Sequence, residues 1–134
     1  MKKKEVVKAP KTADAKLKSL KVSPIKLAAL ARTIKGMPVN KAVAALTFST
    51  KGAAKDVNKL LKSAMSNAEN NFGLDIDKLY IKNVDVGKSM VLKRFTARGR
   101  GKSSKLLKPF SNIRIVVAEQ EAIVRATKTK ANKE

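Results

Sequence analysis

The apolar positions of this chain follow a strand-like period first, a helical period next and a strand-like period again. Residues 16–22 alternate between apolar and polar side chains, which predicts a short strand. Apolar side chains then recur at helical spacing, which predicts a first helix from Pro24 to about residue 35. Two further stripes predict a short second helix ending near Phe48 and a longer third helix over about 51–71.

The residues that flank these stripes are typical of helix boundaries. Ser23 is expected to cap the first helix, because a serine oxygen accepts hydrogen bonds from free N–H groups. Pro24 follows it at the first helical position, where its missing N–H costs nothing. By the same reasoning Asn40 is a candidate cap for the second helix, and Ser49 or Thr50 for the third.

The second half of the chain predicts two paired strands. In the first, apolar positions break phase between Ile81 and Val84, which suggests a bulge. In the second, Ile113, Ile115 and Val117 alternate cleanly, and the two runs are expected to be the arms of one hairpin. The whole layout predicts the α+β class: a small three-stranded antiparallel sheet packed on three helices, with a long protruding β-hairpin.

Length and composition place one domain between two peripheral segments. The chain has 134 residues, which is the size of one ordinary domain, expected here over residues 16–120. Residues 1–15 are rich in lysine and show no periodicity, so a disordered basic arm is expected. Residues 121–134 are expected to form a C-terminal tail of mixed charge.

Charge changes this picture more than any other bulk property. The chain carries 31 Lys and Arg against 10 Asp and Glu, for a net charge of +21. A lone domain with that charge repels itself and binds polyanions, so a permanent polyanionic partner is expected. Nucleic acid is the first candidate, since neutralising its phosphates releases counterions.

The basic residues concentrate in one stretch, residues 88–108, between the two strand-like arms. No Asp or Glu occurs from Val86 to Ala118. Basic residues at short spacing put charge on both faces of an extended ribbon, and interspersed apolar residues argue against a merely solvated linker. Gly99 and Gly101 are expected to allow a tight reversal at its centre. Few aromatics are available for base stacking, so the pattern favours phosphate and shape recognition of a large folded RNA.

Catalytic chemistry finds little support, and an enzyme is not expected. The chain contains no His and no Cys, so the commonest general base, the thiol nucleophile and a Cys/His zinc site are all missing. Ser23 and Lys26 match an S-x-x-K motif without its companion motifs, and residues 101–103 resemble only the end of a phosphate-binding loop. No cofactor, metal site or catalytic residue is predicted. Other candidate classes are a nucleoid-type DNA-binding protein, an RNA-modifying enzyme and a cationic membrane-surface protein.

Several motifs in order resemble one known family. Residues 59–79 read KLLKSAMSNAENNFGLDIDKL, and SPIK stands at 23–26, IKG at 34–36 and LKRFTARGRGKSSKLLKPFSNIRIVV at 92–117. Together they resemble the bacterial large-subunit ribosomal protein L twenty-two family over about residues 17–120. The resemblance implies a structural constituent of the large ribosomal subunit that binds ribosomal RNA and supports subunit assembly and translation, with a cytoplasmic location in the ribosome.

The resemblance also implies where the contacts are made. The hairpin, about 82–116, is expected to line the nascent-peptide exit tunnel, with Arg98, Gly99, Arg100 and Gly101 at its tunnel-facing tip. The implied partners are large-subunit ribosomal RNA, neighbouring ribosomal proteins and the nascent peptide, and no membrane. The implied RNA-binding residues on the body and the hairpin are Ser23, Lys26, Ser63, Asn67, Asn70, Lys88, Lys93, Arg94, Arg98, Arg100, Lys102, Lys105 and Lys108.

Overall fold

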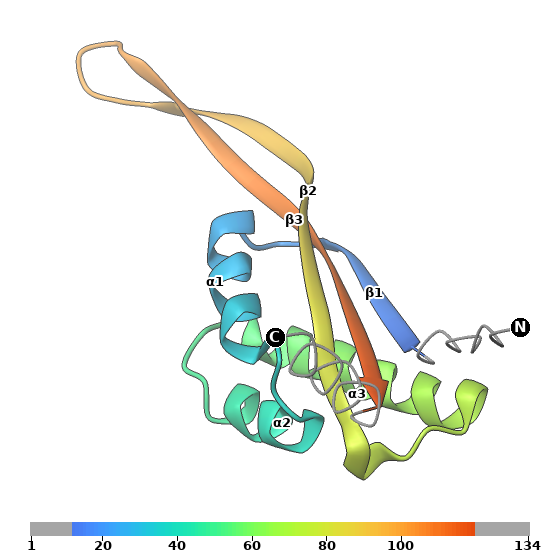
Figure 1. Ribbon diagram of the computed structural model, residues 1–134. Coiled ribbons are helices and arrows are strands. Elements are labelled where there is room, and N and C mark those ends of the chain that lie inside the picture. The colour runs from blue at the N-terminus through green and yellow to red at the C-terminus, as the bar shows by residue number, and fades with distance from the viewer. Residues whose placement is uncertain (1–11, 120–134) are drawn as a thin grey trace, which may run out of the picture.

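Three helices and a three-stranded sheet form the body from which a long hairpin projects (Figure 1). The computed structural model describes residues 12–119. The predicted α+β class is confirmed, including the protruding hairpin. The elements, in chain order, are β1 (Thr12–Leu20), α1 (Pro24–Ile34), α2 (Val39–Thr47), α3 (Ala54–Phe72), a short 3-10 helix (Ile76–Lys78), β2 (Leu79–Ala97) and β3 (Ser103–Glu119).

The helices bury the apolar stripes that the sequence pattern marks. Leu27 and Ile34 of α1 are fully buried, as are Val57 and Leu61 of α3. Ala64 of α3 is also fully buried, and its small side chain lets the helix approach the sheet closely. α3 packs mainly against β1 and α1 mainly against β2, so the core lies between the helices and one face of the sheet.

The first helix begins at Pro24 as predicted, whereas the second and third begin elsewhere than at their predicted caps. Ser23 precedes α1, as expected, but its side chain makes no capping hydrogen bond within the described residues. α2 begins at Val39, directly after the extended Pro38 at the N-cap position, so Asn40 lies inside the helix. α3 begins only at Ala54, because the preceding residues form a turn in which the Ser49 side chain accepts from the Lys51 N–H at 3.4 Å.

β1 begins at Thr12, four residues before the predicted strand, so the expectation that residues 12–15 belong to a basic arm is wrong. These residues pair with the end of β3 and bury Ala13 and Ala15 against the core. Alanine is too small to stand out in an apolar pattern, which explains the error. The rest of the predicted arm and the predicted tail over 121–134 lie outside the described residues.

β3 is the central strand of an antiparallel sheet in the order β1-β3-β2. Its residues Ile113, Ile115 and Val117 are at most 2% exposed. The predicted bulge in β2 is confirmed by a register shift between Ile81 and Asn83. A second shift, between Lys88 and Val91, was not predicted and falls where the hairpin leaves the body.

Beyond this second shift β2 and β3 continue as a two-stranded ribbon, with its last pair between Ala97 and Ser103. Figure 1 shows this ribbon projecting away from the helices. Residues 88–97, at roughly 3.3 Å each, span about 33 Å. From Val91 onward the basic stretch is therefore a regularly paired hairpin up to its tip, residues 98–102.

Candidate nucleic-acid interface

The hairpin presents cations on both of its faces, as the spacing predicts. Opposite residues of an antiparallel pair share a face, and neighbours along a strand alternate. Lys93 lies opposite Leu107 on one face, and Arg94 lies opposite Leu106 on the other. Each of these cations therefore has a large apolar side chain across the ribbon. All the hairpin cations of the predicted set are exposed: Lys88, Lys93, Arg94, Arg98, Arg100, Lys102, Lys105 and Lys108.

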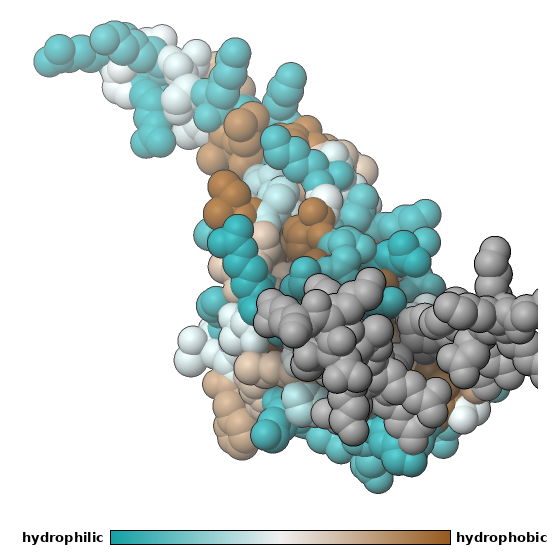
Figure 2. Space-filling view, in the orientation of Figure 1, coloured by the Kyte–Doolittle hydropathy of each residue, from teal (hydrophilic) through white to brown (hydrophobic). Residues whose placement is uncertain are grey.

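Large apolar side chains on the hairpin are exposed as well. Phe95 is 76% exposed and Leu107 57% exposed. Figure 2 shows this apolar surface broken by hydrophilic surface along the hairpin, with a hydrophilic far end. Methyl groups and cations side by side suit a partner that offers both sugar or base surface and phosphate, which is what folded RNA offers.

The tip is a tight turn held by backbone hydrogen bonds. The Arg98 N–H donates to the Lys102 carbonyl at 2.7 Å, and the Arg98 Nε donates to the Ser104 Oγ at 3.4 Å. Gly101 reverses the chain with a φ of +69°, as predicted, but the other left-handed residue is Arg100, with a φ of +58°, and not Gly99. A left-handed arginine costs roughly 1–2 kcal/mol, so the tip carries local strain.

On the body, a groove collects residues that lie far apart in sequence. It has a volume of about 870 Å³ and lies between the start of α1, the turn before α3 and β3. It brings together Ser23, Lys26 and Lys108 of the predicted set. It also includes two exposed lysines that the sequence interpretation missed, Lys21 and Lys51.

A sequence signal existed for one of these two lysines. Both stand just before a helix, where the free N–H groups already make the field positive and a cation is unfavourable. α1 has no acidic residue in its first turn to offset this. A lysine at a helix start without an acidic residue indicates an anionic partner, and that rule would have added Lys21. It would not have added Lys51, because Asp56 lies in the first turn of α3.

The remaining predicted RNA-binding residues lie on α3. Ser63, Asn67 and Asn70 recur at i, i+4 and i+7, which places them on one side of the helix. Ser63 and Asn70 are exposed, whereas Asn67 is partly buried and its Nδ2 donates to the Asp14 carbonyl of β1 at 3.2 Å. Asn67 therefore also ties α3 to the edge of the sheet, and only its carbonyl oxygen has no protein hydrogen-bond partner within the described residues.

The comparison with known families fits this geometry. The family model described as ribosomal protein L22p/L17e matches residues 15–118. The chain belongs to this family. Membership confirms the resemblance carried by the sequence motifs and makes the chain a structural ribosomal protein, not an enzyme.

Curated relatives of the family agree over most of the chain. The protein named large ribosomal subunit protein uL22 in Acidiphilium cryptum is 50% identical over 118 residues, covering 88% of this chain and 77% of the relative. The protein of the same name in Gluconobacter oxydans is 50% identical over 116 residues, covering 87% and 82%. That of Phenylobacterium zucineum is 52% identical over 108 residues, covering 81% and 86%.

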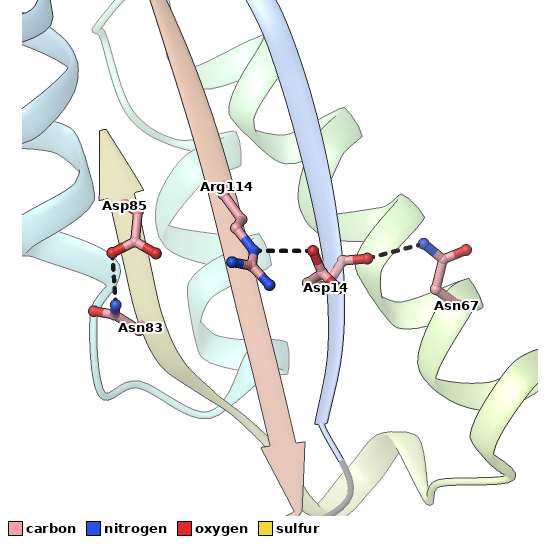
Figure 3. A network of polar contacts seen from close by, with 5 residues as sticks. All are labelled: Asp14, Asn67, Asn83, Asp85 and Arg114. Atoms are coloured by element: carbon pink, nitrogen blue, oxygen red, sulfur yellow. Dashed lines mark hydrogen bonds and ion pairs between the residues drawn. The ribbon is translucent and has the colours of Figure 1, made fainter. Parts of the chain in front are cut away.

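One cation of the segment 86–118, which contains no Asp or Glu in this L22p/L17e family member, is paired with an acidic residue of the body. Arg114 lies on β3 opposite Lys16 of β1 and Asp85 of β2, and its side chain points toward the neighbouring Asp14 (Figure 3). Its Nε donates to the Asp14 Oδ2 at 2.9 Å, and the two side chains are 46% and 40% exposed. The backbone carbonyl of Asp14 also accepts the hydrogen bond from Asn67, so Asp14 connects β3 and α3 at the edge of the sheet. Arg114 therefore belongs to the body.

Asp75 and Asp77 form contacts within a turn. Asp75 caps the 3-10 helix, because its Oδ1 accepts from the Asp77 N–H at 3.2 Å. Lys78 lies 3.2 Å from the other carboxylate oxygen. The hydrogen bond from Lys78, followed by that from Asp77, lowers the pKa of Asp75 below its usual value. Within residues 12–119 no group of three or more potential metal ligands occurs, and no helix is long and apolar enough to span a membrane.

Proposed function

We propose that this chain, a large-subunit ribosomal protein, binds ribosomal RNA through its body and its hairpin, and that the hairpin tip reaches the wall of the nascent-peptide exit tunnel. Neighbouring ribosomal proteins and the nascent peptide are its further partners. In this role the chain supports assembly of the subunit and translation.

The observation that carries the proposal is the projecting ribbon. It extends about 33 Å beyond the body at roughly 3.3 Å per residue, with cations on both faces and exposed apolar side chains between them. Exposed apolar surface of this kind marks a binding surface on a soluble protein. RNA covers such a ribbon from both sides, whereas a duplex groove would meet one face only.

The body and the tip have different jobs in this proposal. Lys26 and the α3 side chains Ser63 and Asn70 are exposed on the body, where they can anchor the chain to RNA. Arg98 and Arg100 stand at the far end, where an arginine can bind phosphate with two parallel hydrogen bonds. Anchoring to RNA then depends on the body and the part of the ribbon next to it, and the tip shapes the tunnel wall.

Deletion of residues 98–101 tests this division. We expect the shortened protein to remain in purified large subunits at wild-type occupancy, while sensitivity to macrolides or nascent-chain stalling changes in the strain that carries it. A matched control replaces residues 98–101 by four alanines, which keeps the length and removes the charge and the glycines. Loss of the shortened protein from subunits would show that the tip is an anchor and that the proposed division is wrong.

A further inference from the structure

The groove on the body is more than a patch of positive charge. Most of its lining is apolar, and six of these residues come from the end of β1, the segment after it, α1 and β3: Leu20, Val22, Ala29, Leu30, Leu107 and Pro109. Four exposed lysines stand among them: Lys21, Lys26, Lys51 and Lys108. Asp56 is the one acidic residue in the described lining. The groove thus pairs an apolar surface with a strongly positive surround.

Phosphate alone does not account for this combination. A duplex backbone would satisfy the lysines from outside and leave the apolar lining uncovered. The volume of about 870 Å³ falls in the range of sites that enclose small molecules. A nucleotide whose base is turned out of its stack fits both parts, since its base offers an apolar face and its flanking phosphates offer charge.

The backbone adds donors to the same place. Ser23 makes no capping hydrogen bond within the described residues, so the first N–H groups of α1 lack a side-chain acceptor there. Such groups bind phosphate readily, and the helix dipole adds to the attraction. The lysines converge on this helix start from the segment before α1, α1 itself, the turn before α3 and β3.

We propose that the groove between α1, the turn before α3 and β3 binds one unstacked nucleotide of ribosomal RNA, with the base against the apolar lining and its phosphates among the four lysines. The inference rests on the proposed RNA-binding function and deepens it. It makes the body a reader of RNA shape at a single bulged position and not only an electrostatic anchor.

The test compares two RNA hairpin oligonucleotides with the same stem, one of which has a single bulged nucleotide. The full chain should bind the bulged RNA more tightly by roughly tenfold, the effect of burying about 55 Å² of apolar base surface against the aliphatic lining. Ala29→Phe fills the groove without changing charge, and it should remove this preference while leaving binding to the plain stem. Ala45→Phe, at an exposed position on α2 outside the groove, is the matched control and should keep the preference.

Crosslinking locates the contact independently of folding effects. A photoreactive amino acid at position 29 of the full chain, incorporated into large subunits, should crosslink to a nucleotide of ribosomal RNA. Equal affinity for the two oligonucleotides, an Ala29→Phe variant that keeps the preference, or a crosslink to protein only would each overturn the inference. Failure of the wild-type chain to bind either oligonucleotide would contradict the proposed function itself, so the two failures are distinguishable.

Discussion

The two halves of the β2–β3 pair have the same backbone pairing and opposite surroundings. At the body end, Ile81, Ile115 and Val117 are completely buried under the helices. At the far end, Phe95 is 76% and Leu107 is 57% exposed, although the strands remain paired to Ala97 and Ser103. Backbone pairing therefore extends to the end of the hairpin, with two register shifts on the way, whereas apolar burial stops where the helices stop.

This difference separates what folds by itself from what depends on a partner. A two-stranded ribbon is only marginally stable in water without a covered apolar face. The body has such a face, and the far ribbon does not. Net positive charge on both faces of the ribbon adds repulsion that only a polyanion removes. We therefore expect the body to determine the stability of the free protein and the ribbon to determine its contacts with RNA.

The largest expected effect comes from one pair of substitutions on the same strand. Ile115→Ala removes a fully buried side chain and should lower the free energy of unfolding by about 2–5 kcal/mol. Leu107→Ala removes a side chain that is 57% exposed and should change it by less than about 0.5 kcal/mol. Urea denaturation measures both. Similar losses for the two variants would mean that the far ribbon belongs to the cooperative core.

A smaller effect is expected at the tip. Gly101→Ala places a side chain at a φ of +69° and should destabilise the turn by about 1 kcal/mol, equivalent to about fivefold faster exchange of the Arg98 amide. Gly87→Ala is the control, since Gly87 has an ordinary φ and an added Cβ meets no atom within 4 Å. Hydrogen exchange followed by NMR measures both. Unchanged exchange in Gly101→Ala would contradict the turn geometry.

The smallest effect distinguishes a body cation from the ribbon cations. A double-mutant cycle of Asp14→Asn and Arg114→Gln should give a coupling of about 0.2–1 kcal/mol, as for other exposed ion pairs. Arg114→Gln should also leave the salt dependence of RNA binding unchanged, because its guanidinium is held by Asp14. A shallower salt dependence in this single variant would place Arg114 with the RNA-binding cations.

The strong periodic signals of the sequence predicted most of this fold. The stripes of α1 and α3 and the alternation around Ile115 correspond to the buried residues, because burial selects bulky apolar side chains at the period of each element. β1 was placed four residues late, because Ala13 and Ala15 are small and give a weak signal. Caps were predicted at Ser23 and Asn40 from residue type. α1 does begin directly after Ser23, but without a side-chain capping bond, and α2 begins at Val39, before Asn40.

The candidate site, like the fold, was predicted from the sequence only in part. The basic ribbon was visible in the sequence because its cations are consecutive along two strands. The groove was not, because Lys21, Lys51 and Lys108 meet only after the chain has folded. Arg114 shows the converse, since a residue inside a basic run can be held by an acid 100 positions away. Sequence gives the amount of charge, and tertiary structure decides which charges remain available for RNA.

Salt dependence of binding to large-subunit ribosomal RNA tests the central claim most directly. If the wild-type chain neutralises about six phosphates, log K should fall with log salt at a slope of about −4 to −5. Neutralising Lys88, Lys93, Arg94 and Lys105 to Gln should make that slope shallower by about 3, since each lost phosphate contact removes about 0.7–0.9. The same change at four exposed body lysines outside the groove, Lys35, Lys41, Lys55 and Lys82, should change the slope by less than about 1. Equal changes in the two variants would contradict the account, because binding would then follow total charge and not the ribbon.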